Sequence, residues 1–530
     1  MAPRPLSPLR LPPSLAALVA LTLGAGPLAA QLPPLTVPKR HVRVDLGGSF
    51  AAWDQRFLAG KLQPAAQDFM REQVGSDFFP ALAPAESILA RVTGLAGSRF
   101  DLGKTTATHF VTRGTTAFGL AYGLTSKLTL FGVVPIVWVD VRSTFGQEPG
   151  TANSGFNPAS AVFGDAPGQV QSAQFFNQFD TALSTLAKQI SEGTYDGDLA
   201  TKQLAEETLA KGTALQVDLF ALIAGPGASP FLPTQSSATG TALVGTVTAL
   251  QATLSGSLGV TGFEQTPALP SQPLGNADFN NFVSNADGPV AGSLAVPPTL
   301  TALGDIELGA AYAIIDQLGR PGVRSGFRLA AQGLIRLRTS TRPRPGLFFD
   351  VGTGDRQPDL EFGMAADGLY HRFGARLSAG YNLQLTGKAN QRISAPWQPI
   401  AYANTLAGLQ NNLGNEIRVG LTPFFRLAPT FGLVAGVTYT RKGTDTWSLL
   451  AGQDSIPGAP PTLLGLDSEA TWTTAMAGLS FSSPLDVTKG KPRLPLDAGF
   501  VWEGVIAGSG GRTPKSSSVR FFIRLYRRFP

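Results

Sequence analysis

The chain has no cysteine and only three histidines among its 530 residues. Without cysteine, an exported protein has no disulfide framework, no thiolate metal site and no cysteine nucleophile. The histidines are His41, His109 and His371, and none has a partner at the spacing of a zinc motif. No P-loop, G-x-S-x-G motif or strand-to-helix glycine fingerprint is present. These absences argue against an enzymatic function, a bound metal ion and a bound cofactor.

Long apolar runs are also missing. Beyond Gln31 no stretch reaches the roughly 18 apolar residues of a transmembrane helix. The net charge of +6 is mild and dispersed, which excludes nucleic acid as an expected partner.

Residues 1–30 have the order of a secretory signal peptide. Arg4 and Arg10 precede a short apolar run, Leu15–Leu23, and the segment ends in Leu28-Ala29-Ala30. The run is too short to span a bilayer, and its flanks suit cleavage before Gln31. We therefore expect export and exclude this segment from the fold.

A period of two is the main pattern in the rest of the chain. Between Phe373 and Leu385, large or apolar residues alternate with polar or small ones. One face consists of Phe373, Ala375, Leu377, Ala379, Tyr381, Leu383 and Leu385, and the other of Gly374, Arg376, Ser378, Gly380, Asn382 and Gln384. Val323–Leu337 and Phe431–Tyr439 alternate in the same way. Successive side chains of a strand point to opposite sides, so each segment predicts a strand with one apolar face.

A water-soluble β-sandwich would alternate as well. Two features favour a barrel in lipid: the segments reach the 9–11 residues that tilted membrane strands need, and aromatic residues lie near the ends of the apolar faces. These aromatic residues are Trp138, Tyr312, Tyr381, Tyr439 and Trp502. They fit the interfacial girdles of outer-membrane barrels.

The predicted fold is all-β: a transmembrane antiparallel up-and-down β-barrel of about twelve strands, with fourteen as the alternative, and a helical loop insertion. The predicted strands are His41–Trp53, Lys104–Tyr122, Lys127–Phe145, Leu303–Asp316, Val323–Ser340, Gln357–Ala366, Arg372–Leu385, Gly414–Leu427, Thr430–Lys442, Ala470–Phe481, Leu496–Ala507 and Ser517–Phe529. Short turns alternate with long connections, as periplasmic turns alternate with extracellular loops. An even count puts both ends of the barrel in the periplasm.

Four regions follow from this division. Residues 1–30 are the signal peptide, 31–145 the first part of the barrel, 146–302 a helical extracellular insertion and 303–530 the second part of the barrel. Within 146–302 the spacing becomes helical, first over Phe175–Ile190, then over Leu199–Ile223 and Leu243–Leu254. The insertion is either a surface cap whose helices only pack on each other, or a lid or plug over the pore.

The last strand supports the barrel independently. It alternates from Val519 to its terminal aromatic residue, Phe529. A terminal aromatic on an amphipathic strand resembles the C-terminal signal that the barrel-assembly machinery reads in bacterial outer-membrane proteins. Pro530, which follows the aromatic residue, departs from that pattern.

Three segments resemble the outer-membrane family named for the MetA pathway of phenol degradation, whose members are described as transporters. They are Phe118–Val137 (FGLAYGLTSKLTLFGVVPIV), Gly304–Ile314 (GDIELGAAYAI) and Val351–Tyr381. The resemblance implies a monomeric barrel that passes small, apolar molecules, and it implies no catalytic residues. The helical insertion departs from the family pattern.

If the apolar faces meet lipid, the opposite faces surround the lumen. The residues that we expect to line the pore are Arg324, Arg328, Arg336, Arg338, Asp305, Glu307, Asp359, Glu361, Arg372, Arg376, Arg418, Arg426, His109 and Arg113. The same alternation places further charges inward at Arg43, Asp45, Glu416, Asp497, Glu503, Arg520, Arg524 and Arg528.

Strand direction separates these charges along the pore. We expect carboxylates at the extracellular end to pair with Arg336 and Arg338 across neighbouring strands. Arginines with fewer acidic neighbours form a basic zone at the periplasmic end, namely Arg324, Arg328, Arg372, Arg376, Arg426 and Arg528. The charges either stiffen a narrow barrel or form a constriction that orients polar or anionic groups.

The sequence therefore predicts a bacterial outer-membrane channel or diffusion transporter for small molecules. Its expected partners are outer-membrane lipid, the barrel-assembly machinery and the small-molecule substrate. The alternative is a surface-exposed structural or binding barrel with an occluded lumen. An inward His109 near Arg113, on a threonine-rich strand, leaves a Ser/His hydrolase as the enzymatic alternative.

Overall fold

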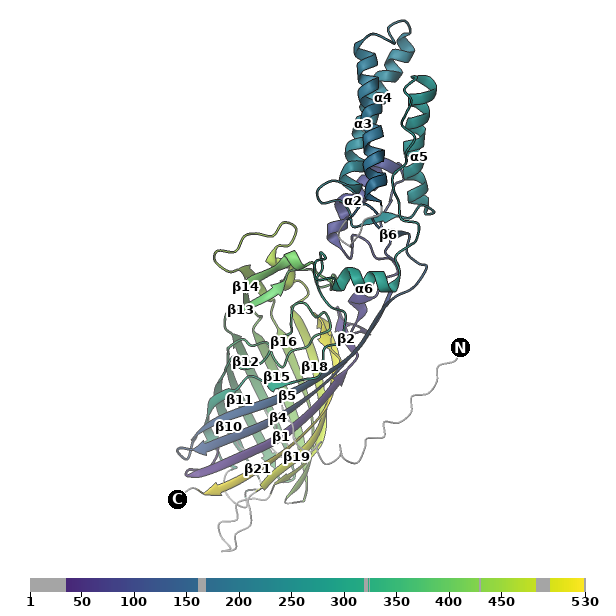
Figure 1. The fold of residues 1–530 in the computed structure, drawn as a ribbon. Helices are drawn as coiled ribbons and strands as arrows, with labels where there is room; N and C mark the ends of the chain where they lie inside the picture. The colour runs from purple at the N-terminus through teal and green to yellow at the C-terminus, as the bar shows by residue number, and fades with distance from the viewer. Residues whose placement is uncertain are drawn as a thin grey trace, which may run out of the picture.

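Twelve long strands form a closed antiparallel ring in the described part of the chain (Figure 1). The structure is a computed structural model that describes residues 35–160, 168–318, 323, 325–428, 430–482 and 496–528. The expected signal peptide, Arg324 and Phe529 lie outside these residues.

Each barrel strand pairs with its neighbours in the ring, and β1 closes it by pairing with both β4 and β21. The barrel strands are β1 (His41–Trp53), β4 (Thr105–Gly123), β5 (Leu128–Gln147), β9 (Glu307–Asp316), β10 (Ser325–Arg336), β11 (Asp359–Tyr370), β12 (Phe373–Gln384), β15 (Glu416–Ala428), β16 (Phe431–Lys442), β18 (Ala470–Ser482), β19 (Leu496–Gly510) and β21 (Ser517–Arg528). The predicted barrel of twelve strands is confirmed, and the alternative of fourteen is wrong for the described residues.

Three predicted strands need correction, and one of them, predicted over Val323–Ser340, is β10, which ends at Arg336. The strand predicted over Leu303–Asp316 is divided into β8 (Leu300–Leu303) and β9, which both pair with β5. At the break Pro135 of β5 offers no N–H, and its carbonyl accepts the amide of Gly304 at 2.9 Å. In addition, β11 continues beyond Ala366 to Tyr370, so its turn to β12 is shorter than predicted.

The two faces of the wall have opposite chemistry, as the alternation predicted. Outward Phe362 and Leu377 are each 55% exposed, whereas inward Glu361 and Arg376 are buried. At the outward pair of Gly114 and Trp138, a Cβ on the glycine would lie 2.0 Å from the indole Nε1. Glycine is thus required there for the indole to cover the backbone of the neighbouring strand.

The apolar band on the outside of β5 ends at Trp138. The next outward residues of this strand are Asp140 and Arg142, which form an ion pair with each other at 3.2 Å. Because charged side chains are costly against lipid, the strand has left the apolar band at this point.

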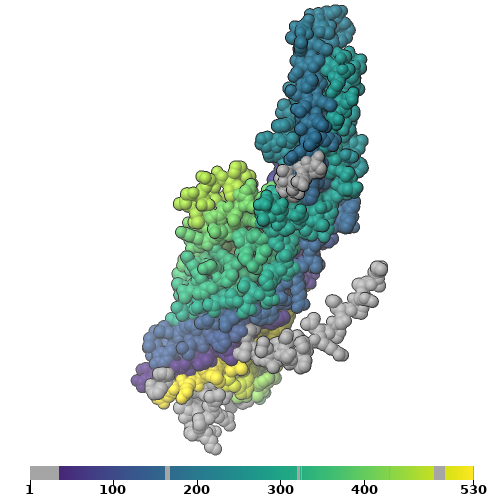
Figure 2. Space-filling view, in the orientation of Figure 1, coloured from purple at the N-terminus to yellow at the C-terminus, as the bar shows by residue number. Residues whose placement is uncertain are grey.

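The two ends of the barrel differ. The end where β1 begins and β21 ends carries short turns, and we call it the turn end. The opposite end carries the long connections, and we call it the loop end. A column of helices projects from the loop end well beyond the strands (Figures 1 and 2).

The projecting column is built from four helices of the 146–302 segment and one from the first long connection. They are α3 (Gln169–Ser191), α4 (Leu199–Ile223), α5 (Ala238–Ala252, continued by the π-helical turn Thr253–Ser257), α6 (Asn276–Ser284) and α2 (Ala83–Thr93). The helical spacings predicted over Phe175–Ile190, Leu199–Ile223 and Leu243–Leu254 correspond to α3, α4 and α5 with its π-helical turn, whereas α2 and α6 were not predicted. One apolar core joins α2 to the other helices through Leu89 and Val92. In the described ranges, no helix is long and apolar enough to cross a membrane.

Short strands complete the loop end. They are β2 (Gln55–Leu58), β3 (Lys61–Pro64) and β20 (Thr513–Pro514) in one sheet, β13 (Gly387–Arg392), β14 (Leu406–Asn412) and β17 (Thr446–Leu449) in a second, and β6 (Ser154–Phe156) with β7 (Phe231–Pro233). Single turns of 3₁₀ helix lie at Gln67–Phe69, Pro80–Leu82, Ala403–Thr405 and Pro461–Gly465.

Tyr195 ties the tip of the helical column together. Its hydroxyl lies 2.7 Å from the carbonyl of Leu258 and 2.6 Å from the side-chain oxygen of Gln189. We expect Tyr195→Phe to lower the stability of the column by about 0.5–1.5 kcal/mol, because one buried carbonyl loses its partner. Protease susceptibility of the column measures the change, with Tyr439→Phe on the outward face of β16 as the control. Equal susceptibility of both variants would contradict this role.

Candidate functional site: the barrel lumen

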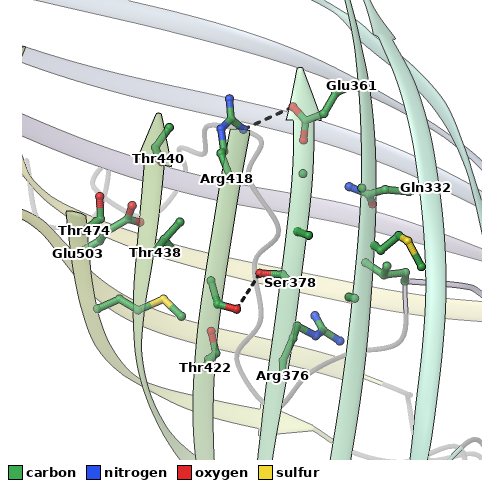
Figure 3. A pocket seen from close by; sticks show the side chains of 18 of the residues that line it. Gln332, Glu361, Arg376, Ser378, Arg418, Thr422, Thr438, Thr440, Thr474 and Glu503 are labelled. Carbon is green, nitrogen blue, oxygen red and sulfur yellow. Dashed lines mark hydrogen bonds and ion pairs between the residues drawn. The ribbon is translucent and has the colours of Figure 1, made fainter. Parts of the chain in front are cut away.

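A cavity of about 350 Å3 lies inside the barrel. Its wall is formed by inward side chains of strands β10 to β21, and Figure 3 shows ten of them labelled. Polar lining residues are Gln332, Glu361, Arg376, Ser378, Arg418, Thr422, Thr438, Thr440, Thr474, Glu503 and Arg520. Met476, Trp472 and Leu35 add apolar surface.

A buried arginine at the loop end of the lumen is bound by three carboxylates. Arg336 of β10 contacts Glu307 at 2.8 Å, Asp359 at 3.2 Å and Glu361 at 2.6 Å. These contacts cross from β10 to β9 on one side and to β11 on the other, as strand register predicted. All four side chains are at most 15% exposed.

Arg418 extends this cluster toward the cavity. It contacts Glu361 at 3.4 Å (Figure 3) and Glu416 at 2.7 Å. Two arginines therefore face four carboxylates, so the cluster carries an excess of negative charge. Such a ring favours cations over anions at this level of the lumen.

The middle of the lumen is lined by hydroxyl groups. Thr422, Thr438 and Thr474 come from three successive strands, β15, β16 and β18 (Figure 3). Ser378 lies on the next strand, β12, and its hydroxyl is 3.4 Å from the carbonyl of Gly420. This belt offers hydrogen bonds without charge.

The predicted basic zone at the turn end is only partly present. Arg376 forms a buried pair with Asp367 at 2.6 Å, and Arg328 contacts Asp367 at 3.6 Å and Asp316 at 3.1 Å. The predicted strand ends at Ala366, which places Asp367 in the following turn. Asp367 is instead an inward residue of the longer β11 and is 1% exposed.

A second cluster of paired charges lies where β1 and β21 close the barrel. Arg43 of β1 binds Asp45 at 2.8 Å, and Arg524 of β21 lies 3.5 Å from the same carboxylate. The hydroxyl of Tyr526 donates to Asp497 at 2.6 Å. The inward placement predicted for these charges agrees with their burial.

Side chains from two loops fill part of the lumen at the loop end. Phe349, in the connection between β10 and β11, is 2% exposed and packs on the valines of β4 and β5, with Val111 and Val139 among them. Its ring lies 4.7 Å from that of Phe69 and 5.8 Å from that of His109. The same connection is held by Arg113, which donates to the carbonyl of Thr353 at 2.7 Å.

The chain segment before β1 narrows the lumen at the turn end. Val37 is 1% exposed and packs against Ala121 and Tyr526 on the inner wall. Its amide donates to the hydroxyl of Thr129 at 2.7 Å. Leu35, two residues earlier, lines the cavity itself. Neither obstruction was predicted, because each depends on contacts between distant segments.

The remaining predicted residues occupy different places. Arg372 lies in the exposed turn between β11 and β12, because β11 extends farther than predicted. Arg338 is exposed at the loop end. Asp305 does not pair with an arginine as expected; it accepts the amides of Thr339 and Ser340. Arg426 has no acidic partner among the residues described.

His109 is fixed in the barrel wall by contacts with its neighbours. Its Nδ1 is 2.8 Å from the hydroxyl of Ser143, and its ring is stacked on Phe349. In the described ranges no carboxylate contacts it, so the pair lacks the third group that orients a catalytic histidine. Those ranges also contain no cluster of three or more acidic or histidine side chains that could hold a metal ion.

No protein-family model and no curated protein sequence matches this chain. Solved barrels are similar to it. The outer membrane channel COG4313 from Pseudomonas putida F1 is 10% identical, with a TM-score of 0.37 over 94% of this chain and 99% of that one. A TodX monoaromatic hydrocarbon channel (deltaS2S3 mutant) is 10% identical, with a TM-score of 0.28 over 93% and 91%. A Pseudomonas aeruginosa FadL homologue is 7% identical, with a TM-score of 0.28 over 93% and 91%.

Proposed function

We propose that this protein is an outer-membrane channel through which small molecules diffuse. The observation that carries the proposal is the cavity of about 350 Å3 inside a closed barrel whose outer surface is apolar. A barrel built only for stability would fill this space with packed side chains.

The orientation follows from the two ends of the barrel. Short turns and both ends of the barrel chain belong on the periplasmic side, and long connections on the extracellular side. The turn end is then periplasmic, and the helical column of segment 146–302 stands outside the cell. The amphipathic strand β21 is the part that the barrel-assembly machinery would read.

The lining indicates the kind of molecule that passes. Met476, Trp472 and the threonine methyl groups supply apolar contacts, while Gln332 and the threonine hydroxyls supply uncharged hydrogen bonds. This combination suits small molecules with a largely apolar body and one polar group. The acidic excess around Arg336 disfavours free anions.

The helical column acts as a cap beside the entrance rather than as a plug within it. Its core includes Phe78 and Phe79 from the first connection, both fully buried. Deleting 146–302 would expose these rings, so point substitutions test the entrance more cleanly than the deletion.

A binding barrel with an occluded lumen is the second candidate. It is favoured by the two obstructions, Phe349 at the loop end and Leu35–Val37 at the turn end. Single-channel conductance and swelling of proteoliposomes distinguish the two functions. Conductance above that of protein-free bilayers supports the channel; no conductance from the protein or its opened variants refutes it.

Thr129→Val tests the obstruction at the turn end. The substitution removes the acceptor of the Val37 amide and leaves a buried donor without a partner, a cost of about 1–3 kcal/mol. We expect the segment to leave the lumen more often and the conductance to rise. Thr129→Ser keeps the hydroxyl and serves as the matched control. If both variants conduct like the parent protein, this segment does not limit the flow.

A further inference from the structure

A second hollow lies at the loop end, outside the cavity described above. Its volume is about 390 Å3, and its lining consists of Arg338, Arg342, Arg356, Lys388, Ala389 and Asn390. Four of these six residues are cationic and none is acidic. They come from the connection between β10 and β11 and from the start of β13.

The four cations of the hollow differ from Arg336 in their surroundings. Among the described residues, Arg338, Arg342, Arg356 and Lys388 form no ion pair, whereas Arg336, two residues before Arg338, has three. Like charges that share a hollow repel one another, and an anion within it would remove that repulsion.

The guanidinium groups are oriented by backbone carbonyls, which do not neutralise them. Arg342 donates to the carbonyls of Asp355 and Lys388, the latter at 2.6 Å. Arg338 donates to the carbonyl of Thr386 at 3.5 Å. These contacts leave other N–H groups of both side chains for a ligand, because each guanidinium has five.

The backbone at Arg356 is strained. Its φ is +52°, a left-handed conformation that costs free energy for a residue with a side chain. Its amide is fixed by the hydroxyl of Ser340 at 2.9 Å. Such strain is typical of ligand-binding loops, where the surrounding structure holds a side chain in place.

The hollow also disfavours the charged form of Arg342. Burial lowers the pKa of Arg342 below its usual value, and Arg356 and Arg338 act in the same direction. Asp355 and Asp305 oppose them, and neither lines the hollow. The arginine nevertheless remains protonated, and these two carboxylates compensate its charge only in part.

We propose that this hollow binds the phosphate group of a ligand. Three guanidiniums and one ammonium match the several oxygens and the double charge of a phosphate better than a single carboxylate. The phosphate belongs either to a lipid headgroup of the surrounding leaflet or to a soluble phosphate compound. Binding here does not require that the barrel conduct.

The test uses the full chain in detergent micelles. Calorimetric titration with inorganic pyrophosphate measures the soluble source, and titration with lipid A in the same detergent measures the lipid source. We expect the double variant Arg342→Gln with Arg356→Gln to weaken phosphate binding by about tenfold for each cation removed. Arg441→Gln, which removes a surface arginine paired with Glu469, is the matched control.

Each outcome decides the proposal. Pyrophosphate binding that the double variant loses assigns a soluble phosphate, and lipid A binding alone that it loses assigns a lipid headgroup. No binding of either probe, or equal binding by the double variant and the Arg441 control, overturns the site. Conductance of the same preparations is measured separately, so loss of phosphate binding and absence of channel activity are not confused.

Discussion

Arg336→Met is expected to destabilise the barrel by about 3–5 kcal/mol. The substitution keeps most of the side-chain volume but leaves Glu307, Asp359 and Glu361 buried and without their shared cation. Removing one partner of a buried ion cluster costs far more than removing a surface pair, because the remaining charges cannot be hydrated. The midpoint of urea unfolding in lipid vesicles, followed by tryptophan fluorescence, measures the loss.

The same variant changes the lumen. With one positive charge removed, the acidic excess at the loop end grows, so we expect cation selectivity to increase in reversal-potential measurements. Arg441→Met is the control, since its pair with Glu469 is more than half exposed and contributes at most about 1 kcal/mol. Adding Glu361→Gln to Arg336→Met should restore part of the stability. An Arg336→Met barrel as stable as the control variant would refute the role of this cluster.

Phe349→Ala is expected to open the loop end. Burying a phenylalanine ring contributes about 3–5 kcal/mol relative to alanine, and this ring holds its connection against β4 and β5. A loss of 3 kcal/mol raises the population of the displaced connection by roughly a hundredfold. We therefore expect longer or more frequent open states in single-channel records.

Phe349→Leu separates the effect of a smaller apolar side chain from the effect of removing the side chain. Leucine keeps an apolar plug of similar reach, so this variant should retain most of the closed-state population. Tryptic cleavage of the connection after its exposed Arg356 gives a second measurement, which should accelerate only in the alanine variant. If neither proteolysis nor conductance responds to Phe349→Ala, the ring does not control the entrance.

Strand placement was predictable because it depends on local alternation. The segment Phe373–Leu385 contains both faces of β12 in its own residue order, so no distant contact was needed. The ion pairing of Arg336 with carboxylates was also predictable, because neighbouring antiparallel strands lie at a fixed spacing.

The end of β11 shows where local reasoning failed. Asp367 and Gly368 form the dipeptide typical of a hairpin turn, yet the chain turns later, at His371, whose φ is +53°. Asp359, Glu361 and Asp367 lie on the same inward face of β11. Their alternation indicated the end of the strand better than the Asp-Gly dipeptide did. Because the turn was predicted too early, Asp367 was not recognised as the partner of Arg376. The predicted basic zone therefore contained more unpaired arginines than the structure has.

The sequence by itself determined which faces meet lipid and which surround the lumen, because a strand's side chains alternate whatever its partners are. Only the tertiary structure decided which charges are neutralised and where the lumen is obstructed. Phe349 and Leu35–Val37 reach the inner wall from outside the barrel strands, and the residues that they contact are fixed by strand register around the whole ring. A pattern with a period of two carries no information about such contacts.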